Sequence, residues 1–309
     1  MKSVTVIIPT YDRWSLVCSS IDSALNQSYP NTECMVVDDL STDQTVTLLQ
    51  NKYGNRIKIV SNKKNRGQAY CRNLGAQLCK SDYICFLDSD DILEYDAIEK
   101  RISFFNEKKD DVAVSFGLIR TPGMKEHPLL KKKKHGDTLV LSEYLEHHSW
   151  CHNNGFLIDR EVFLRDGKYN EKLRNKEDIE LLLRLLCKYP FYYCGSEIGE
   201  VRDVSHNRAR NNYIKIIEQG SLFSDTLLSN DQLRDNLSDD VIYGFISSDV
   251  EEELRALYKL GNYAKYRMLY KQALKDGYIN NTKRFVKRYL LSLIKGFFHK
   301  KESDHDELY

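Results

Sequence analysis

The sequence predicts an α/β fold, in which a mostly parallel sheet is flanked by helices and followed by an all-helical C-terminal region. Short apolar runs alternate with helical stretches over residues 4–118. These runs are continuous and rich in β-branched residues, which is typical of strands buried on both faces. From about residue 211 onward the strand signal stops and only helical patterns remain.

The alternation defines the elements in order. Strands are predicted at Val4–Ile8, Glu33–Val37, Ile57–Val60, Tyr83–Leu87 and Val112–Leu118. The helices between them are predicted at Leu16–Asn26, Gln44–Lys52, Gln68–Cys79 and Tyr95–Asn106, and three later helices at Asp249–Lys259, Tyr263–Lys275 and Thr282–His299. We therefore expect two domains, residues 1–212 and residues 213–309.

Composition excludes several classes of protein. The 309 residues carry 46 basic and 45 acidic side chains, so bulk charge does not indicate a nucleic-acid-binding protein. No apolar run approaches the ~20 residues of a membrane-spanning helix, and the first apolar run is too short for a signal peptide. The eight cysteines are scattered without a Cys-x-x-Cys pair, as in proteins of a reducing compartment. We expect a cytoplasmic location.

Polar residues follow three predicted strands directly. They are Pro9–Arg13 after the first strand, Asp38–Asp43 after the second and Asp88–Asp91 after the fourth. Ligands of open parallel sheets bind at the carboxyl ends of the strands, and a cluster of carboxylates there suits Mg²⁺ or Mn²⁺. The sequence contains neither a P-loop nor a Gly-x-Gly-x-x-Gly after the first strand, which argues against P-loop enzymes and dinucleotide dehydrogenases.

Four segments in order carry a resemblance to a known family. They are Val6–Arg13, Val37–Thr45, Asn65–Asn73 and Phe86–Asp91. Together they resemble the inverting glycosyltransferases of family 2, of the bacterial surface-polysaccharide type, which have the A-type glycosyltransferase fold. The resemblance covers roughly residues 1–210, and nothing comparable supports residues 215–309.

The resemblance implies a UDP-sugar donor. Tyr11 would stack on the uracil, Asp39 would contact the base or ribose, Arg72 would meet the diphosphate, and Asp88 would touch the ribose or sugar. The donor-binding residues expected in this way are Pro9, Thr10, Tyr11, Asp12, Arg13, Asp39, Gly67, Arg72, Asp88 and Ser89. Leu40 and Gln44 stand where the family usually has glycine, and Cys71 stands for alanine. Asp43 and Asp91 are interpreted as ordinary turn or cap residues.

The resemblance also implies the chemistry. Asp90 would ligate the metal, Mn²⁺ or Mg²⁺, and His206 is either a second metal or phosphate contact or an ordinary loop histidine. Inversion needs a base for the acceptor hydroxyl. Asp178 would be that base, with Glu177 orienting it or reaching the metal. The alternative for both is acidic charge at a helix N-terminus.

Two further segments have competing interpretations. Residues 147–152 contain three histidines, but a structural zinc site needs four well-spaced ligands, so we expect a helix end, with Trp150 as a candidate sugar platform. Residues 282–301 carry seven basic and no acidic side chains, with Val286, Leu290 and Leu293 on one side of the expected helix. Such a helix lies on an anionic membrane or packs on the protein with a solvated basic face.

These expectations combine into one function. The chain would be a metal-dependent inverting glycosyltransferase of the hexosyltransferase class, acting in surface polysaccharide or lipopolysaccharide synthesis. It would transfer a sugar from a UDP-sugar to a saccharide or lipid-linked saccharide acceptor at the inner face of the cell membrane. The alternative is a non-catalytic member that binds a nucleotide-sugar or saccharide and anchors an assembly at the membrane. A nucleotidyltransferase would show a Gly-rich basic loop after the first strand, which Tyr11–Arg13 is not.

Overall fold

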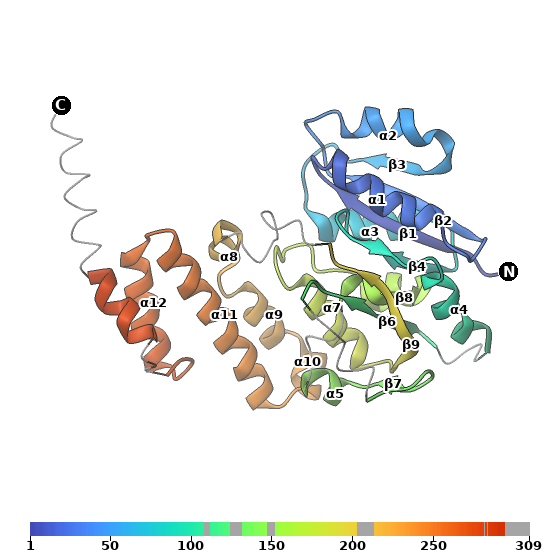
Figure 1. Ribbon diagram of the computed structural model, residues 1–309. Coiled ribbons are helices and arrows are strands. Elements are labelled where there is room, and N and C mark those ends of the chain that lie inside the picture. Colours follow the sequence, from blue (N-terminus) through green and yellow to red (C-terminus); the bar gives the residue numbers. More distant parts are fainter. Residues whose placement is uncertain are drawn as a thin grey trace, which may run out of the picture. The chain divides into compact units, whose positions relative to one another are not determined.

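The computed structural model describes residues 1–107, 112–123, 132–146, 152–202, 213–280, 282 and 284–293. The chain divides into two compact units, which are coloured along the sequence in Figure 1. Unit 1 comprises Met1–Lys172 and Glu177–Val204, and unit 2 comprises Leu173–Lys176 and Ser205–Tyr309. Within the described residues, no helix is both long and apolar enough to span a bilayer.

Unit 1 is built on a nine-stranded sheet. Its strands are β1 (Val4–Thr10), β2 (Thr32–Asp38), β3 (Lys58–Ser61), β4 (Tyr83–Phe86), β5 (Ile92–Leu93), β6 (Val114–Arg120), β7 (Thr138–Leu139), β8 (Phe156–Asp159) and β9 (Phe191–Glu200). The order is β3-β2-β1-β4-β8-β6-β9-β5, and β7 also pairs with β9. The first four strands are parallel, as predicted. The other half is mixed, because β8 runs antiparallel to both β4 and β6.

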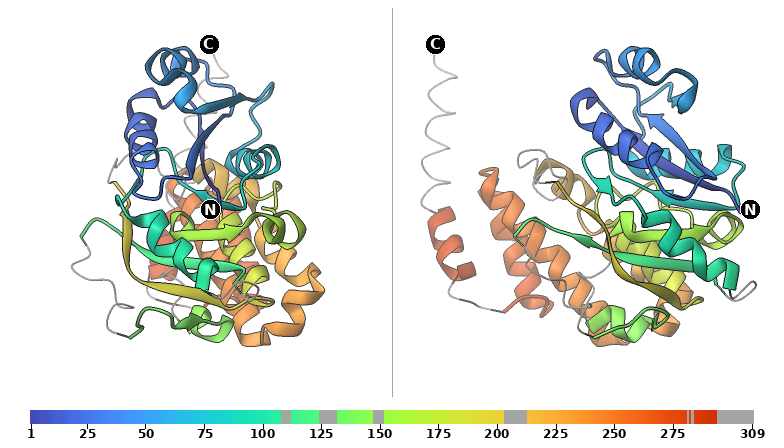
Figure 2. Two further views of the ribbon diagram at one scale, coloured as in Figure 1. Left: turned by 90° about the vertical axis from the view of Figure 1, so that its right-hand side faces the viewer. Right: turned by 45° about the vertical axis from the view of Figure 1, so that its right-hand side comes forward.

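Helices cover both faces of this sheet. They are α1 (Trp14–Leu25), α2 (Thr45–Tyr53), α3 (Gln68–Leu78), α4 (Ala97–Glu107), α5 (Leu141–Glu146), α6 (Arg160–Val162) and α7 (Glu177–Leu186), and Figure 2 gives two further views. Val6 and Ile8 of β1 pack in one core cluster with residues of α1 and α4. Ile7 points to the opposite face, where α3 lies so close that a Cβ on Gly75 would meet Ile7 Cγ2 at 2.5 Å.

The described residues of unit 2 form helices and the segments that connect them. It contains α8 (Tyr213–Gln219), α9 (Leu222–Ser229), α10 (Asp231–Asn236), α11 (Asp239–Lys259), α12 (Tyr263–Lys275) and a helix over residues 284–293. Leu254, Leu257, Tyr266, Tyr270 and Phe285 are the main members of its own hydrophobic core. The helix α11 starts ten residues before the predicted Asp249, with Ser238 as its N-cap. Of the predicted helix 282–299, the part from residue 294 onward lies outside the described residues.

Candidate functional site

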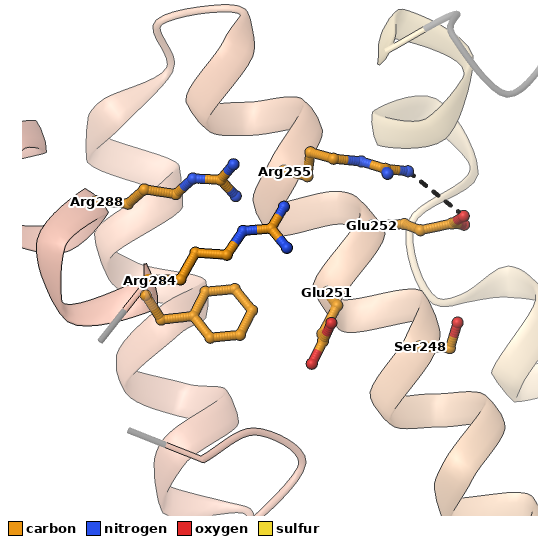
Figure 3. A pocket seen from close by; sticks show the side chains of 7 residues that line it. Ser248, Glu251, Glu252, Arg255, Arg284 and Arg288 are labelled. Atoms are coloured by element: carbon orange, nitrogen blue, oxygen red, sulfur yellow. Dashed lines mark ion pairs between the residues drawn. The ribbon is translucent and has the colours of Figure 1, made fainter. Parts of the chain in front are cut away.

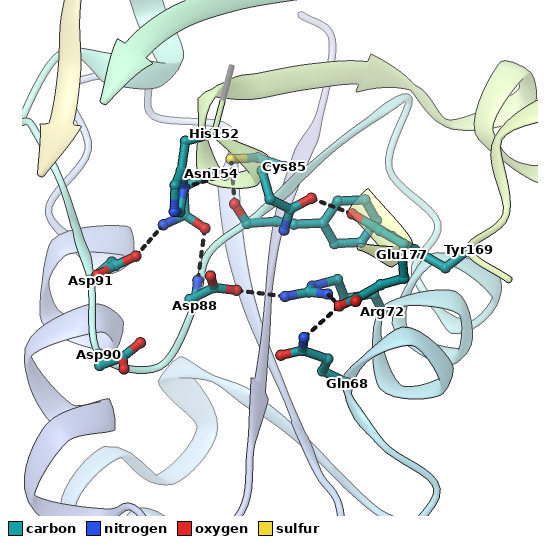
Figure 4. A network of polar contacts seen from close by, with 12 residues as sticks. Gln68, Arg72, Cys85, Asp88, Asp90, Asp91, His152, Asn154, Tyr169 and Glu177 are labelled. Carbon is teal, nitrogen blue, oxygen red and sulfur yellow. Dashed lines mark hydrogen bonds and ion pairs between the residues drawn. The ribbon is translucent and has the colours of Figure 1, made fainter. Parts of the chain in front are cut away.

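A buried arginine joins two distant segments of unit 1. Arg72 lies on α3 and is 2 % exposed. Its Nη2 donates to Asp88 Oδ1 at 2.7 Å, and its Nη1 donates to Glu177 Oε1 at 3.2 Å (Figure 4). Asp88 follows β4, whereas Glu177 is the first residue of α7. The Asp-Ser-Asp segment and the Glu-Asp pair, which are far apart in sequence, are therefore neighbours in space.

Neutral groups complete the surroundings of this arginine. Gln68, one turn earlier on α3, donates its amide to Glu177. The Tyr169 ring lies 5.2 Å from the Arg72 guanidinium carbon. Burial disfavours the charged guanidinium, but Asp88, Tyr169 and Glu177 outweigh it and raise the pKa of Arg72. The arginine is therefore a permanent cation, held in place on several sides.

The two acids at the start of α7 are destabilised in their charged forms. Burial is the main cause that raises the pKa of Glu177, and the neighbouring Asp178 adds to it. Burial also raises the pKa of Asp178, with Arg72 opposing the shift. Asp178 accepts a hydrogen bond from the Ile179 backbone N–H at 2.9 Å. A carboxylate with a raised pKa is a better proton acceptor than an ordinary aspartate, as a general base requires.

Two carboxylates and a histidine gather near the end of β4. Asp88, Asp91 and His152 each offer one ligand atom, and these atoms lie within 4.8 Å of one another. Burial raises the pKa of Asp91 to about 8, and the charges of Asp88 and Asp90 add to the shift. A divalent cation relieves such repulsion, and carboxylate oxygens with one imidazole form a set that Mn²⁺ accepts. The residues present therefore fit a divalent metal ion.

These three candidate ligands are not the residues expected from the sequence, which were Asp90 and His206. Asp90 pairs with Arg13, with Nη1 to Oδ2 at 3.0 Å, and His206 lies outside the described residues. Asp91, interpreted above as a turn residue, is 3 % exposed and accepts from Asn154 Nδ2 at 2.6 Å and from the Arg202 backbone N–H at 3.2 Å. The metal-binding roles of Asp90 and His206 stay predictions.

Two of the expected donor-binding aspartates hold loops in the structure. Asp39 accepts the backbone N–H groups of Arg66 and Gly67 at 2.8 and 2.7 Å. Asp12 accepts the backbone N–H of Thr42 at 2.6 Å and that of Asp43 at 3.2 Å. These bonds fix the loop before α3 and the loop after β2 next to the end of β1.

The remaining expected donor residues occupy the same edge. Pro9 and Thr10 end β1 and are buried, Ser89 is buried beside Asp88, and Gly67 has a φ of 89° that glycine adopts without strain. Tyr11 is 43 % exposed, so its ring is available for stacking. Leu40, which stands where the family has glycine, keeps the left-handed backbone with a φ of 66°. Asp43 accepts from the Thr45 backbone N–H at the start of α2, the ordinary cap role predicted for it.

Sequence reasoning did not predict the contacts that several residues of the site make. Asn154 connects two of the acids, since its Oδ1 accepts from the Asp88 backbone N–H at 3.0 Å and its Nδ2 donates to Asp91. Gln68 was likewise unassigned, and His152 lies in the segment 147–152, where we expected a helix end and not a metal ligand. Amide side chains and single histidines have no periodic signal, so only the fold brings them to the site. Residues 147–151, including Trp150, lie outside the described residues.

An α/β sheet with an Asp-Ser-Asp segment after β4, beside a helix that begins with Glu-Asp, defines an A-type glycosyltransferase. The sequence model of the family described as "Glycosyl transferase family 2" matches residues 5–167. The chain belongs to this family.

Named relatives agree with this class. A putative teichuronic acid biosynthesis glycosyltransferase, TuaG of Bacillus subtilis, is 31 % identical over 214 residues, covering 68 % of this chain and 82 % of that protein. An uncharacterized glycosyltransferase of Haemophilus influenzae is 38 % identical over 34 % of this chain, and chondroitin synthase of Escherichia coli is 30 % identical over 61 %. The matches span only 42 % and 27 % of the lengths of these last two proteins.

A solved structure shows the same fold. The S. aureus TarS 1–349 structure in complex with UDP-GlcNAc has a TM-score of 0.63 and 15 % sequence identity. The alignment covers 97 % of this chain and 92 % of that one. This likeness confirms the predicted fold class, the A-type glycosyltransferase fold with a helical C-terminal region.

Proposed function

We propose that this chain transfers a sugar from a UDP-sugar to a hydroxyl of a saccharide, with inversion at the sugar carbon. The observation that carries the proposal is the Arg72 bridge between Asp88 and Glu177. This bridge brings an acid on the donor side close to Glu177 and to its neighbour Asp178, the predicted general base. Relatives that act in teichuronic acid and chondroitin synthesis, and the TarS complex with UDP-GlcNAc, support a nucleotide-sugar donor and a surface-polysaccharide product.

Asp178 is the general base in this reaction. It accepts the proton of the acceptor hydroxyl as the oxygen attacks the sugar carbon and the UDP departs. Glu177 is held by Arg72 and Gln68, so it fixes the start of α7 and thereby orients Asp178. Tyr11, Asp12, Arg13 and Asp39 form the nucleotide side, together with Gly67 and Ser89.

A divalent cation, Mn²⁺ or Mg²⁺, supplies charge neutralisation to the leaving diphosphate when it is bound. Asp88, Asp91 and His152 are the described residues that would hold it, with Asp90 and His206 as the further ligands predicted from the sequence. Without the metal ion, the positive charge at this edge of the sheet comes from Arg13, paired with Asp90, and from Arg72, paired with Asp88.

We also propose that unit 1 is the catalytic domain and that the C-terminal helix contacts an anionic membrane surface, where a lipid-linked acceptor would lie. Val286, Leu290 and Leu293 are 38, 55 and 47 % exposed and recur at helical spacing on one face. Lys287, which is also exposed, adds positive charge beside them. An exposed apolar stripe flanked by basic side chains is typical of interfacial helices. Such a protein is peripheral on the inner face of the membrane.

Replacing the base tests the proposed reaction. Asp178→Asn keeps the shape of the side chain but removes its ability to accept the proton. We expect transfer from a UDP-sugar to fall by about 10²–10⁴-fold, which is the contribution of a general base. UDP binding, measured by titration calorimetry, should stay within about twofold of wild type.

Glu33→Gln is the matched control, because Glu33 is an exposed carboxylate on β2 of the same unit. It should leave both transfer and UDP binding unchanged. Wild-type turnover in Asp178→Asn would show that another group is the base. UDP binding without turnover in the wild-type chain, under every donor and acceptor, would favour the non-catalytic alternative.

A further inference from the structure

A polar cavity lies within unit 2, apart from the residues of the proposed transfer site. It has a volume of about 230 Å³ and is lined by residues of α11 and of the helix over 284–293 (Figure 3). Three of the lining residues are arginines, Arg255, Arg284 and Arg288. The volume is below the ~300–1,000 Å³ of sites for drug-sized ligands, so it suits one small polar unit.

The cavity keeps an excess of positive charge. Within the described residues, neither Arg284 nor Arg288 forms an ion pair with a carboxylate, and Figure 3 shows both guanidinium groups projecting toward α11. Of the two glutamates in the lining, Glu252 is already bound, by Lys176 Nζ at 2.9 Å and by Arg255 Nη2 at 3.6 Å. Arg284 and Arg288 therefore lack a carboxylate partner there, and the other contact of Arg288 is with the neutral Tyr258 ring, 5.5 Å from its guanidinium carbon.

One donor beside the cavity has no partner. The Nε atom of Arg255 is buried and makes no hydrogen bond, although Nη2 of the same side chain pairs with Glu252. A buried donor left unsatisfied costs about 1–3 kcal/mol. The lining of the cavity therefore includes one side chain whose donors the protein does not satisfy completely.

The helix that forms one wall of the cavity is held in place by the core of unit 2. Phe285, next to Arg284, is 5 % exposed and belongs to the core of unit 2. Arg267 on α12 donates to the Ser292 carbonyl at 2.8 Å, which ties the helix over 284–293 to α12. The arginines thus project from a helix whose position the core determines, and preorganised groups lose less entropy on binding.

The chemistry of the lining identifies the class of ligand. The planar guanidinium groups of Arg284 and Arg288 match a carboxylate or a phosphate ester. Glu251 repels a bare anion but accepts hydrogen bonds from hydroxyl groups, and Ser248 can donate or accept. We propose that this cavity binds an acidic sugar unit of a glycan, with its anionic group on the arginine pair and its hydroxyls on Glu251 and Ser248. The site goes beyond the proposed transfer reaction, since binding here needs no donor.

Titration calorimetry of the full chain tests the site. The probes are tetragalacturonic acid for the carboxylate, glucose 6-phosphate for the phosphate ester, maltotetraose as a neutral glycan, and inorganic phosphate. We expect at least one acidic sugar to bind at least tenfold more tightly than both maltotetraose and inorganic phosphate. Comparing the two acidic probes decides which anionic group is preferred.

Variants locate the binding. Arg284→Gln with Arg288→Gln should weaken binding of the acidic sugar at least tenfold. Lys271→Gln with Lys275→Gln removes the same charge from exposed positions of α12 and should change it less than twofold. Equal losses in both double variants would overturn the site in favour of general charge attraction.

Three other results would also overturn the proposal: no binding of either acidic sugar, binding of inorganic phosphate as tight as that of the sugars, or binding only to phosphatidylglycerol vesicles through the same arginines. UDP binding is measured on the same samples. Intact UDP binding with no glycan binding rejects this site alone, whereas glycan binding without UDP binding rejects the proposed transfer function alone.

Discussion

Arg72 is the residue on which the geometry of the candidate site depends most. It is buried and bonded to two carboxylates, each of which would lose its cationic partner without it. Arg72→Met should destabilise the chain by about 3–5 kcal/mol, because it leaves uncompensated charge in the interior. Denaturant unfolding followed by circular dichroism measures this loss.

Arg72→Lys separates charge from geometry. Lysine keeps the positive charge but cannot donate from two fixed nitrogens to Asp88 and Glu177 at once. We expect a smaller loss of stability than in Arg72→Met, with transfer still reduced at least tenfold. Full activity in Arg72→Lys would show that charge alone suffices and that the bridge does not position α7.

The raised pKa of Asp178 predicts the pH dependence of both rate and stability. The base accepts a proton only when it is ionised, so kcat/KM should fall on the acid side with a pKa above the ordinary 3.8. The folded state also binds this proton more tightly than the unfolded state. Stability is therefore lost as pH rises from 3.8 through the folded pKa.

Asp178→Asn removes the loss of stability that comes from ionising this buried carboxyl group. The variant should be more stable than wild type at pH 7, and the difference should vanish near pH 3, where the wild-type group is protonated in both states. Thermal unfolding at the two pH values measures it. A variant that is less stable at pH 7 would mean that Arg72 stabilises the ionised carboxylate more than burial destabilises it.

At the scale of elements, the first half of the sheet could be predicted from sequence, whereas in the second half only β6 could, from the predicted strand Val112–Leu118. The strands β1, β2 and β4 are continuous apolar runs, with every residue of β1 and β4 buried. The strand β9 instead contains Glu197 and Glu200 among its apolar residues, and β5 and β7 have two residues each. Such strands form because neighbouring strands pair with them, and their own sequence carries little signal.

The candidate site, too, could be predicted only in part from the sequence. Acids that follow strands could be placed from the chain order alone, as Asp88 was, whereas Arg72 was placed by the resemblance to the family. The direction of a side chain could not be predicted, so the hydrogen bonds from the Arg66 and Gly67 backbone to Asp39 were not expected. The nucleotide contact of Asp39 stays a prediction. The short segment 173–176 carries no pattern that associates it with the helices of unit 2.

That segment gives a prediction about unit 2. Lys176 has a φ of 63°, and its Nζ contacts Asp249 Oδ1 at 2.5 Å, while Ser224 donates to Asp249 Oδ2 at 2.6 Å. Asp249 is 8 % exposed, so the pair is buried. Asp249→Ala should destabilise unit 2 by about 3–5 kcal/mol, because Lys176 loses its main partner in the interior.

Denaturant unfolding monitored by hydrogen exchange in α9 and α11 measures the change. Asp240→Ala is the control, since Asp240 is an exposed residue in the first turn of the same helix, and it should cost below about 1 kcal/mol. Equal effects of the two substitutions would show that the buried pair adds nothing beyond ordinary helix charge.

For the whole molecule, the proposed donor site predicts which ligands stabilise the chain and where. A ligand that binds only the folded state raises stability by about 2.7 kcal/mol at a concentration of 100 times its Kd. UDP with Mn²⁺ should therefore raise the unfolding temperature, whereas UDP alone, and GDP, CMP or dTDP with Mn²⁺, should raise it less. Hydrogen exchange should slow in β1, in the loop before α3 and after β4, because the expected donor residues lie there. Protection confined to unit 2, or no shift with any nucleotide, would contradict the donor site and leave the carboxylates at this edge of the sheet without a nucleotide to explain them.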